Sequence, residues 1–213
     1  MTDARTQSVK FYYSPGSRSS TVLWMLEEVG APYDIELINL KAGAQRSPEY
    51  LAINPMGKVP TISHNGAVVT ESAAICCYLA DAFPHAGLAP AIGDPLRGPY
   101  LKWLFYAPSC IEPAMIENAA NIELTPRGMT GWGSYDRVMA TLRGAVGKAS
   151  PYLLGERFTT ADVVIGATLR FGMSFKTIPE LPEFVAYAKR LEERPALQRQ
   201  IAIEADYARQ ITG

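Results

Sequence analysis

Residues 54–72 have the sequence NPMGKVPTISHNGAVVTES, and this stretch decides the fold of the N-terminal half. Two runs rich in β-branched residues flank Asn65-Gly66, a dipeptide that favours a β-hairpin because a type I′ turn needs positive φ at both central positions. Pro60 lies in the first run, and Ser72 follows the second run as a candidate helix N-cap. The stretch therefore predicts strands at 59–63 and 67–70 and a helix from 72 to about 81.

The residues before this stretch alternate between strand and helix signals. Residues 9–13 are β-branched and aromatic and predict a strand, whereas residues 22–30 have apolar side chains at helical spacing and end on a C-cap glycine. Residues 35–40 alternate with period two, as a second strand does. Ser47-Pro48 is typical of a helix start. We therefore expect the order βαβ, a short helix and then ββα within residues 1–85.

After residue 85 the strand signals disappear. Residues 86–95 contain Pro and Gly and predict a linker. The remaining sequence predicts helices, separated by Gly and Pro, over 96–123, 132–149, 160–173, 181–193 and 195–211. We therefore expect an α/β domain over 1–85 and an all-α bundle over 96–213.

Composition and charge exclude several classes of protein. The chain has 213 residues with 20 Lys plus Arg against 21 Asp plus Glu, so neither nucleic acid nor an anionic membrane is an expected partner. Three cysteines, two of them adjacent at Cys76-Cys77, and two histidines predict neither a disulfide framework nor a metal site. No apolar run is long enough to cross a bilayer, and the polar leader at residues 1–8 predicts no signal peptide. We therefore expect a soluble, cytoplasmic protein.

Four motifs occur along the chain in the order of a known family. They are YYSPGSRS at residues 12–19, NPMGKVP at 54–60, TESAAI at 70–75 and GERFTTAD at 155–162. Together with the βαβ–ββα order, they resemble the soluble glutathione S-transferases. The resemblance implies a thioredoxin-like domain (βαβαββα) before the helical bundle, a homodimer, and transfer of the cosubstrate glutathione to a small electrophile.

The resemblance also implies how glutathione is bound. Pro60 would follow a cis peptide bond, and the backbone of Val59 would pair with the cysteinyl part of glutathione as an added strand. Glu71 and Ser72 would hold the γ-glutamyl end at a helix N-terminus, which favours an anion. The alternatives are an ordinary trans proline at an edge strand, and a Ser72 that only caps its helix while Glu71 favours the dipole.

The glycyl carboxylate of glutathione needs a cation or amide donors. Gln45, Arg46 and Lys58 are the candidates, and Lys58 is preferred because its position is fixed next to Val59. The alternative is that these long side chains are solvated on the surface.

The group that activates the thiol is sought at the end of the first strand. The tract at residues 12–19 looks most like the bacterial beta class, but Arg18 stands where that class has its cysteine. We expect Ser17, at the start of the helix, to donate to the thiolate, with Arg18 and Ser19 as the other candidates. The alternatives are that Ser17 only caps the helix and that Arg18 faces solvent.

The site for the electrophile is expected between the domains, lined by the first helices of the second domain. The candidate residues are Trp103, Tyr106, Ser109, Cys110, Pro113 and Met115. A stripe such as Trp103 and Tyr106 also occurs in ordinary helix cores. Two other functions remain open: glutathione-dependent reduction of disulfides or peroxides, and binding of glutathione or another ligand without catalysis.

The last motif ends in Thr-x-x-Asp, from Thr159 to Asp162, before an apolar run. This is a capping box, and it predicts the start of a buried helix without a catalytic role.

Overall fold

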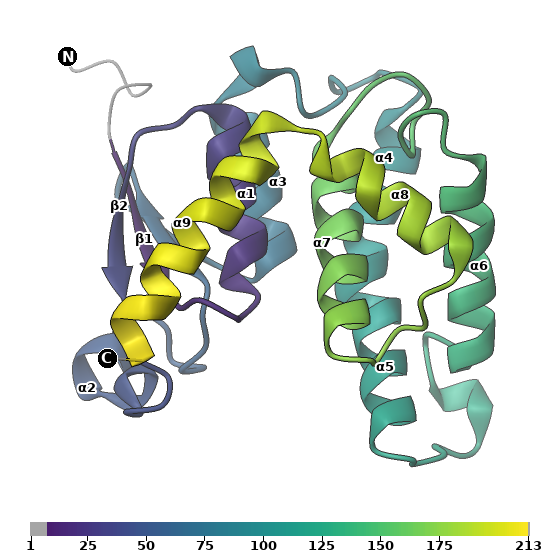
Figure 1. Ribbon diagram of the computed structural model, residues 1–213, viewed down its shortest axis with the longest axis horizontal. Coiled ribbons are helices and arrows are strands. Elements are labelled where there is room, and N and C mark those ends of the chain that lie inside the picture. The colour runs from purple at the N-terminus through teal and green to yellow at the C-terminus, as the bar shows by residue number, and fades with distance from the viewer. Residues whose placement is uncertain (1–7, 213) are drawn as a thin grey trace. The chain divides into compact units, whose positions relative to one another are not determined.

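The computed structural model describes residues 8–212 and divides into two compact units, whose elements are labelled in Figure 1. The first unit extends to Gly87 and resumes at Arg194, and the second is Leu88–Glu193. The polar leader, apart from Ser8, lies outside the described residues.

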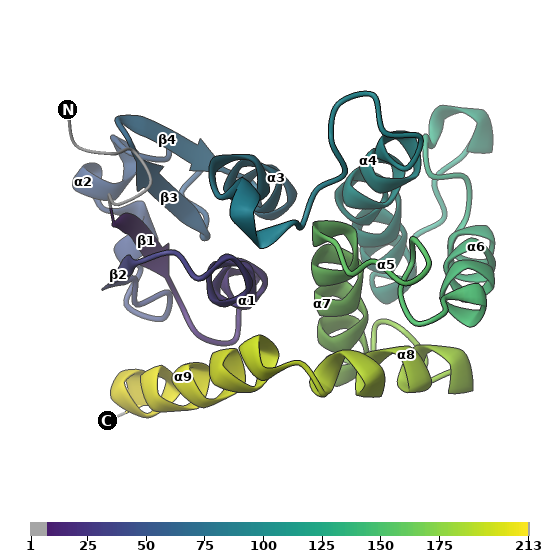
Figure 2. The same cartoon turned by 90° about the horizontal axis from the view of Figure 1, so that it is seen from above.

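A four-stranded sheet with the order β2-β1-β3-β4 forms the centre of the first unit (Figure 2). The strands are β1 (Val9–Tyr13), β2 (Tyr33–Leu37), β3 (Thr61–His64) and β4 (Ala67–Thr70). β1 is parallel to β2 and antiparallel to β3, and β3 is antiparallel to β4. The predicted hairpin turn is confirmed, with φ of 50° at Asn65 and 79° at Gly66. The second strand starts and ends earlier than its alternating pattern at 35–40 predicted.

Side chains on β1 alternate between the two faces of this sheet. Phe11 and Tyr13 contact each other with ring centroids 5.4 Å apart, whereas Tyr12 packs on Tyr50 in a cluster with Ile38. The helical elements of the unit are α1 (Ser19–Val29), η2 (Ala44–Arg46), α2 (Pro48–Leu51), α3 (Ser72–Ala82), η3 (Pro84–Ala86) and α9 (Pro195–Thr212). The mixed sheet with its helices confirms the expected thioredoxin-like domain.

The last helix, α9, departs from the expected domain division. Residues 96–213 were expected to form one helical bundle, but α9 lies along α1 in both views and belongs to the first unit (Figures 1 and 2). Arg194 forms two hydrogen bonds of 2.6 Å with the carboxylate of Glu28, which is on α1. The helical pattern of α9 predicts the helix, but it does not indicate which of two apolar surfaces the helix will cover.

The second unit is all helical. Its elements are α4 (Arg97–Tyr106), the π-helical turn η4 (Ala107–Ile111), α5 (Glu112–Ala119), η5 (Arg127–Met129), α6 (Tyr135–Lys148), α7 (Thr160–Ser174) and α8 (Pro182–Glu192). The continuous helix predicted over 96–123 is therefore interrupted at η4. Pro108 lies in this turn, and a proline inside a helix removes a backbone donor and clashes with the preceding turn.

The segment predicted to be a linker is bonded to the second unit. The carbonyl oxygen of Leu88 accepts from the backbone N–H of Thr160 at 2.9 Å, and that of Ala89 accepts from Arg157 at 3.1 Å. Arg97 donates to the carbonyl of Pro90 at 2.9 Å. Residues 88–90 are thus fixed on the helical unit.

The capping box at the start of α7 is confirmed. Asp162 is fully buried and accepts from the backbone N–H groups of Thr159 and Leu153, at 2.9 and 2.8 Å, and from the hydroxyl of Tyr187 at 2.6 Å. Burial raises the pKa of the Asp162 carboxyl, and these donors act in the opposite direction. The motif joins the irregular segment before α7 to the helix that follows.

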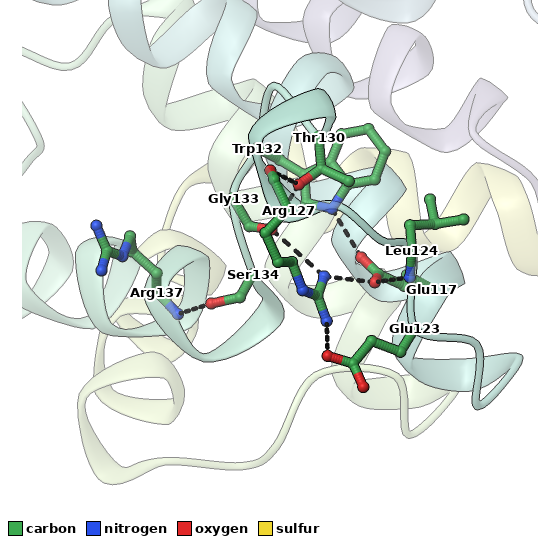
Figure 3. A network of polar contacts seen from close by, with 9 residues as sticks. All are labelled: Glu117, Glu123, Leu124, Arg127, Thr130, Trp132, Gly133, Ser134 and Arg137. Carbon is green, nitrogen blue, oxygen red and sulfur yellow. Dashed lines mark hydrogen bonds and ion pairs between the residues drawn. The ribbon is translucent and has the colours of Figure 1, made fainter.

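A second buried carboxylate holds the loop between α5 and α6 (Figure 3). Glu117 accepts from Trp132 Nε1 at 2.9 Å, from the Leu124 N–H at 3.1 Å and from Arg127 at 2.5 Å. The indole, the N–H and then the guanidinium lower the pKa of Glu117. The carboxylate of Glu117 therefore binds the loop at three positions.

Candidate functional site

The strand register brings three predicted site segments to one edge of the sheet. Tyr12 lies opposite Thr61, and Thr61 lies opposite Thr70. The carboxyl ends of β1 and β4 and the amino end of β3 therefore coincide. The segments at 14–19, 58–60 and 71–72 all extend from this edge.

The loop after β1 is organised by its own hydroxyl groups. Ser17 Oγ donates to the carbonyl of Ser14 at 2.7 Å and accepts from the Ser19 N–H at 3.1 Å, and Ser19 Oγ lies 2.9 Å from Ser17 Oγ. Ser17 is half-buried, whereas Ser19 is fully buried and also accepts from the Ser14 N–H. Of the serines at 17 and 19, Ser17 is thus the accessible one.

The structure corrects where the helix begins. Ser17 was expected at the N-cap, but the N-cap of α1 is Arg18 and the helix starts at Ser19. The Ser17 hydroxyl still accepts from a first-turn N–H, because the chain turns back at Gly16, where φ is 68°. Tyr13 is fully buried, and burial raises the pKa of its hydroxyl far above the usual range, so this phenol stays protonated.

The segment before β3 is fixed through one carbonyl group. The carbonyl oxygen of Lys58 accepts from the hydroxyl of Tyr50 at 2.6 Å and from the side-chain amide of Asn54 at 2.9 Å. The Val59–Pro60 peptide bond is cis, as the resemblance implied. Val59 is half-buried, and its N–H and C=O have no hydrogen-bond partner among residues 8–212. Such a free backbone can pair with an extended peptide.

The other candidates for the glycyl carboxylate pack against this segment. A Cβ at Gly57 would lie 3.0 Å from the carbonyl oxygen of Gln45, and φ at Gly57 is 59°. Only glycine allows this close approach, which places η2 beside Lys58. Arg46 and Lys58 are exposed and Gln45 is half-buried. The contact places Gln45 beside the segment that carries Lys58 and Val59, and Arg46 follows Gln45 in η2.

Glu71 and Ser72 lie at the start of α3, but the residue at the N-cap differs from the predicted one. The predicted N-cap, Ser72, is the first residue of the helix, and Glu71 is the N-cap without a side-chain capping bond. Glu71 is exposed and has φ 68° and ψ 117°, a conformation that is unfavourable for a residue with a Cβ. Such strain is found at ligand-binding positions, and the N–H groups of the first turn of a helix have no partner within the helix.

The candidate acceptor residues lie along α4, η4 and α5 of the second unit. The rings of Trp103 and Tyr106 meet edge to face with centroids 5.2 Å apart, and Trp103 is buried. Tyr106, Cys110 and Pro113 are half-buried, and burial raises the pKa of Tyr106. Ser109 is exposed and donates to the carbonyl of Phe105, while Met115 is buried. Trp103 thus belongs to the core of the unit, whereas Tyr106 is partly accessible.

Side chains of the types that bind metal ions, cysteines among them, are dispersed over the described residues. Within residues 8–212 no three His, Cys, Asp or Glu side chains are grouped to hold a metal ion. Cys76 is fully buried, which raises the pKa of its thiol far above the usual range. None of the helices in this range is long and apolar enough to span a membrane.

The chain is similar in sequence to known proteins, the glutathione S-transferases. Residues 16–82 match the model of the glutathione S-transferase N-terminal domain. Glutathione S-transferase GstA of Escherichia coli O157:H7 is 27% identical over 202 residues, which cover 92% of this chain and 98% of the relative. Residues 16–82 thus resemble the N-terminal domain of glutathione S-transferases, and nearly the whole chain is similar to one of them.

Solved structures of transferases are similar over most of the chain. A glutathione transferase from Methylococcus capsulatus is 28% identical with a TM-score of 0.77, over 92% of this chain and 98% of the other. BphK, a bacterial glutathione S-transferase solved as a ternary complex, is 27% identical with a TM-score of 0.75, over 92% and 99%. LigF of Sphingobium is 37% identical over 91 residues, but this match covers only 35% of LigF.

Three residues of this candidate site were missed from the sequence. Asn54 is the first residue of a quoted motif, so a buried amide that fixes the next turn could have been suspected. Tyr50 reaches the same carbonyl from α2, and Glu204 binds the Ser17 loop from α9. Glu204 is 188 positions from its partner Gly16, and no local sequence pattern predicts a contact over such a separation.

Proposed function

We propose that this protein is a glutathione transferase that holds glutathione as a thiolate and directs it at a small electrophile. The observation that carries the proposal is the meeting, at one sheet edge, of the Ser17 hydroxyl, the unpaired backbone of Val59 and the first turn of α3. A tripeptide with two carboxylates and an ammonium group needs these kinds of partner.

Each part of glutathione has a partner in this arrangement. The backbone of Val59 pairs with the cysteinyl residue, and the hydroxyl and N–H of Ser72 bind the γ-glutamyl carboxylate. Glu71 accepts from the ammonium group. Gln45, Arg46 and Lys58 surround the glycyl carboxylate, with Lys58 as the main cation. The near-zero net charge of the chain is compatible with this, since a small zwitterion needs few placed charges.

Ser17 carries the chemical step. A free thiol has a pKa near ~8.5, so it must be stabilised as the anion to be nucleophilic at neutral pH. Once the thiol proton has passed to solvent, the Ser17 hydroxyl turns its proton from the Ser14 carbonyl to the sulfur, and the N–H groups at the start of α1 add partial positive charge. The thiolate then forms a carbon–sulfur bond with the electrophile, and a leaving group departs with its electron pair. This makes the protein a serine-type enzyme and needs no protein cysteine.

The first unit binds glutathione, and the second supplies the acceptor site around Trp103, Tyr106, Cys110 and Pro113. The π-helical turn supports this assignment, because such turns are frequent at functional sites. We also propose a cytoplasmic homodimer, which the free cysteines and the family resemblance support. Sedimentation at twice the chain mass of 23.2 kDa is expected, and sedimentation at 23.2 kDa would refute the dimer.

Calorimetry with glutathione, together with conjugation of a general aryl halide, tests the function. We expect saturable binding and a glutathione-dependent loss of halide. Absence of binding at millimolar glutathione would contradict the proposal. Binding without conjugation would leave the glutathione site standing and reject this class of electrophile.

A further inference from the structure

The carboxylate of Glu204, on α9, is bonded to the loop that carries Ser17. Its Oε1 accepts from the Gly16 N–H at 2.8 Å and from the hydroxyl of Ser20. Its Oε2 accepts from Gln200 Nε2, which lies one turn earlier on α9. Gly16 and Ser20 lie on either side of Ser17, so one carboxylate oxygen spans the loop.

Groups other than Glu204 also dock α9 on α1. Arg194 binds Glu28 with two hydrogen bonds of 2.6 Å, and Arg199 binds Glu27 at 2.6 Å. The rings of Tyr207 and Tyr13 add an edge-to-face contact with centroids 5.6 Å apart. The helix is thus held along its length by other groups, whereas Glu204 binds Gly16 in the loop, Ser20 in the first turn of α1, and Gln200.

The contact has two opposite effects on a thiolate beside Ser17. It fixes Gly16, whose φ of 68° sets the direction in which the chain turns and therefore where the Ser17 hydroxyl lies. Hydrogen bonds to a charged group are stronger than those between neutral groups, so this is a firm anchor. However, a carboxylate near the first turn of α1 offsets the positive potential that would stabilise the thiolate.

We propose that Glu204 is a positioning residue, which holds the Ser17 hydroxyl in place and raises the pKa of the bound glutathione thiol. The inference rests on the proposed function, and it assigns part of the glutathione site to the last helix of the chain. Glu204 does not touch the reacting atoms and acts through Gly16 and Ser20.

Three variants separate the anchor from the charge. Glu204→Ala removes both, and Glu204→Gln removes the charge but keeps an acceptor oxygen. Asp206→Asn is the control, because Asp206 is exposed on the same helix and pairs with Arg209 rather than with the loop. All three retain the ion pairs that dock α9.

Amide hydrogen exchange without ligand measures the anchor directly. We expect the Gly16 amide to exchange about tenfold faster in Glu204→Ala, because a hydrogen bond to a charged acceptor is lost, and to remain near wild type in the other two variants. Equal protection of Gly16 in Glu204→Ala and wild type would overturn the anchor.

The pH profile of kcat/KM measures the effect on the thiol. Glu204→Gln is expected to lower the apparent pKa of the bound thiol, and Glu204→Ala to lower kcat about tenfold with a smaller change in KM for glutathione. Asp206→Asn should match wild type in both. Profiles of Glu204→Gln and wild type that coincide would overturn the charge effect, and an unchanged kcat in Glu204→Ala would overturn the positioning role.

If the wild-type protein neither binds nor conjugates glutathione, the proposed function fails and the catalytic role of Glu204 fails with it. The exchange rate of the Gly16 amide still decides whether the anchor exists.

Discussion

At the scale of single residues, removal of the Ser17 hydroxyl is the most direct test of how the glutathione thiol is activated. Ser17→Ala should lower kcat/KM for conjugation about 10- to 100-fold, because one hydrogen bond to a charged sulfur is lost, while the calorimetric affinity for glutathione changes little. The apparent pKa of the bound thiol should rise, since the anion loses a donor.

Ser19→Ala is the matched comparison, because Ser19 is fully buried behind Ser17. It should affect stability more than turnover. A larger loss of turnover in Ser19→Ala than in Ser17→Ala would move the activating role to Ser19.

Some positions of the site residues could be predicted from the sequence, and others could not. The positions of Val59-Pro60 before β3 and of Glu71-Ser72 at the start of α3 were predicted from local turn and helix-start signals, and their binding of glutathione stays a prediction. The start of α1 was misplaced by one residue or more, because Ser17, Arg18 and Ser19 are all acceptable near an N-cap and only the backbone angles decide. Glu204 could not be found, since its partner lies in a distant part of the chain.

At the scale of elements, the start of α7 depends on one carboxylate. Asp162→Ala should lower the free energy of unfolding by about 2 kcal/mol or more, because the cap is lost and the buried donors of Leu153 and Tyr187 lose their acceptor. Ser134→Ala removes only the exposed N-cap of α6 and should cost about 1 kcal/mol. Denaturant unfolding measures both, and equal costs would show that the buried network adds nothing.

The loop between α5 and α6 should respond to acid. The pKa of Glu117 is lowered by Trp132, the Leu124 N–H and Arg127, so its contribution to stability is complete above the ordinary carboxyl pKa of ~4.3 and is lost as the pH falls through the lower folded value. Below about pH 4 we therefore expect faster proteolysis within residues 120–133. Glu117→Gln should remove most of this pH dependence.

Glu123→Gln is the control for that loop, because the Glu123 carboxylate also pairs with Arg127 but is exposed. It should leave the acid-induced change intact. A pH-independent proteolysis rate in the wild-type protein would show that Glu117 does not hold the loop.

Elements themselves were predicted well where the signal was local. The Asn65-Gly66 turn, the Gly30 C-cap and the Ser47 N-cap were confirmed, because each depends on residues in direct sequence contact. The break at η4 was missed, since the apolar pattern over 96–123 continues through Pro108.

At the scale of the whole molecule, the first unit is built from two distant segments of the chain, and this arrangement was not predictable from helical periodicity. Glu28 on α1 is nearly buried and accepts from both Arg194 and the Trp24 indole. Glu27 is paired with Arg199, whose side chain is mostly exposed. The two ion pairs join the same two helices but differ in exposure, so they should differ in energy.

Arg194→Ala should therefore destabilise the first unit by about 3–5 kcal/mol, because it leaves a buried carboxylate with only one donor, whereas Arg199→Ala should cost about 1 kcal/mol or less. Trp24 is the tryptophan of the first unit, and Trp103 and Trp132 belong to the second. Denaturant unfolding followed by fluorescence, with Trp103→Phe and Trp132→Phe as the background, isolates the signal of Trp24. Equal costs for the two arginines would mean that the buried pair contributes no more than an exposed one, and that α9 is held on α1 by apolar contacts alone.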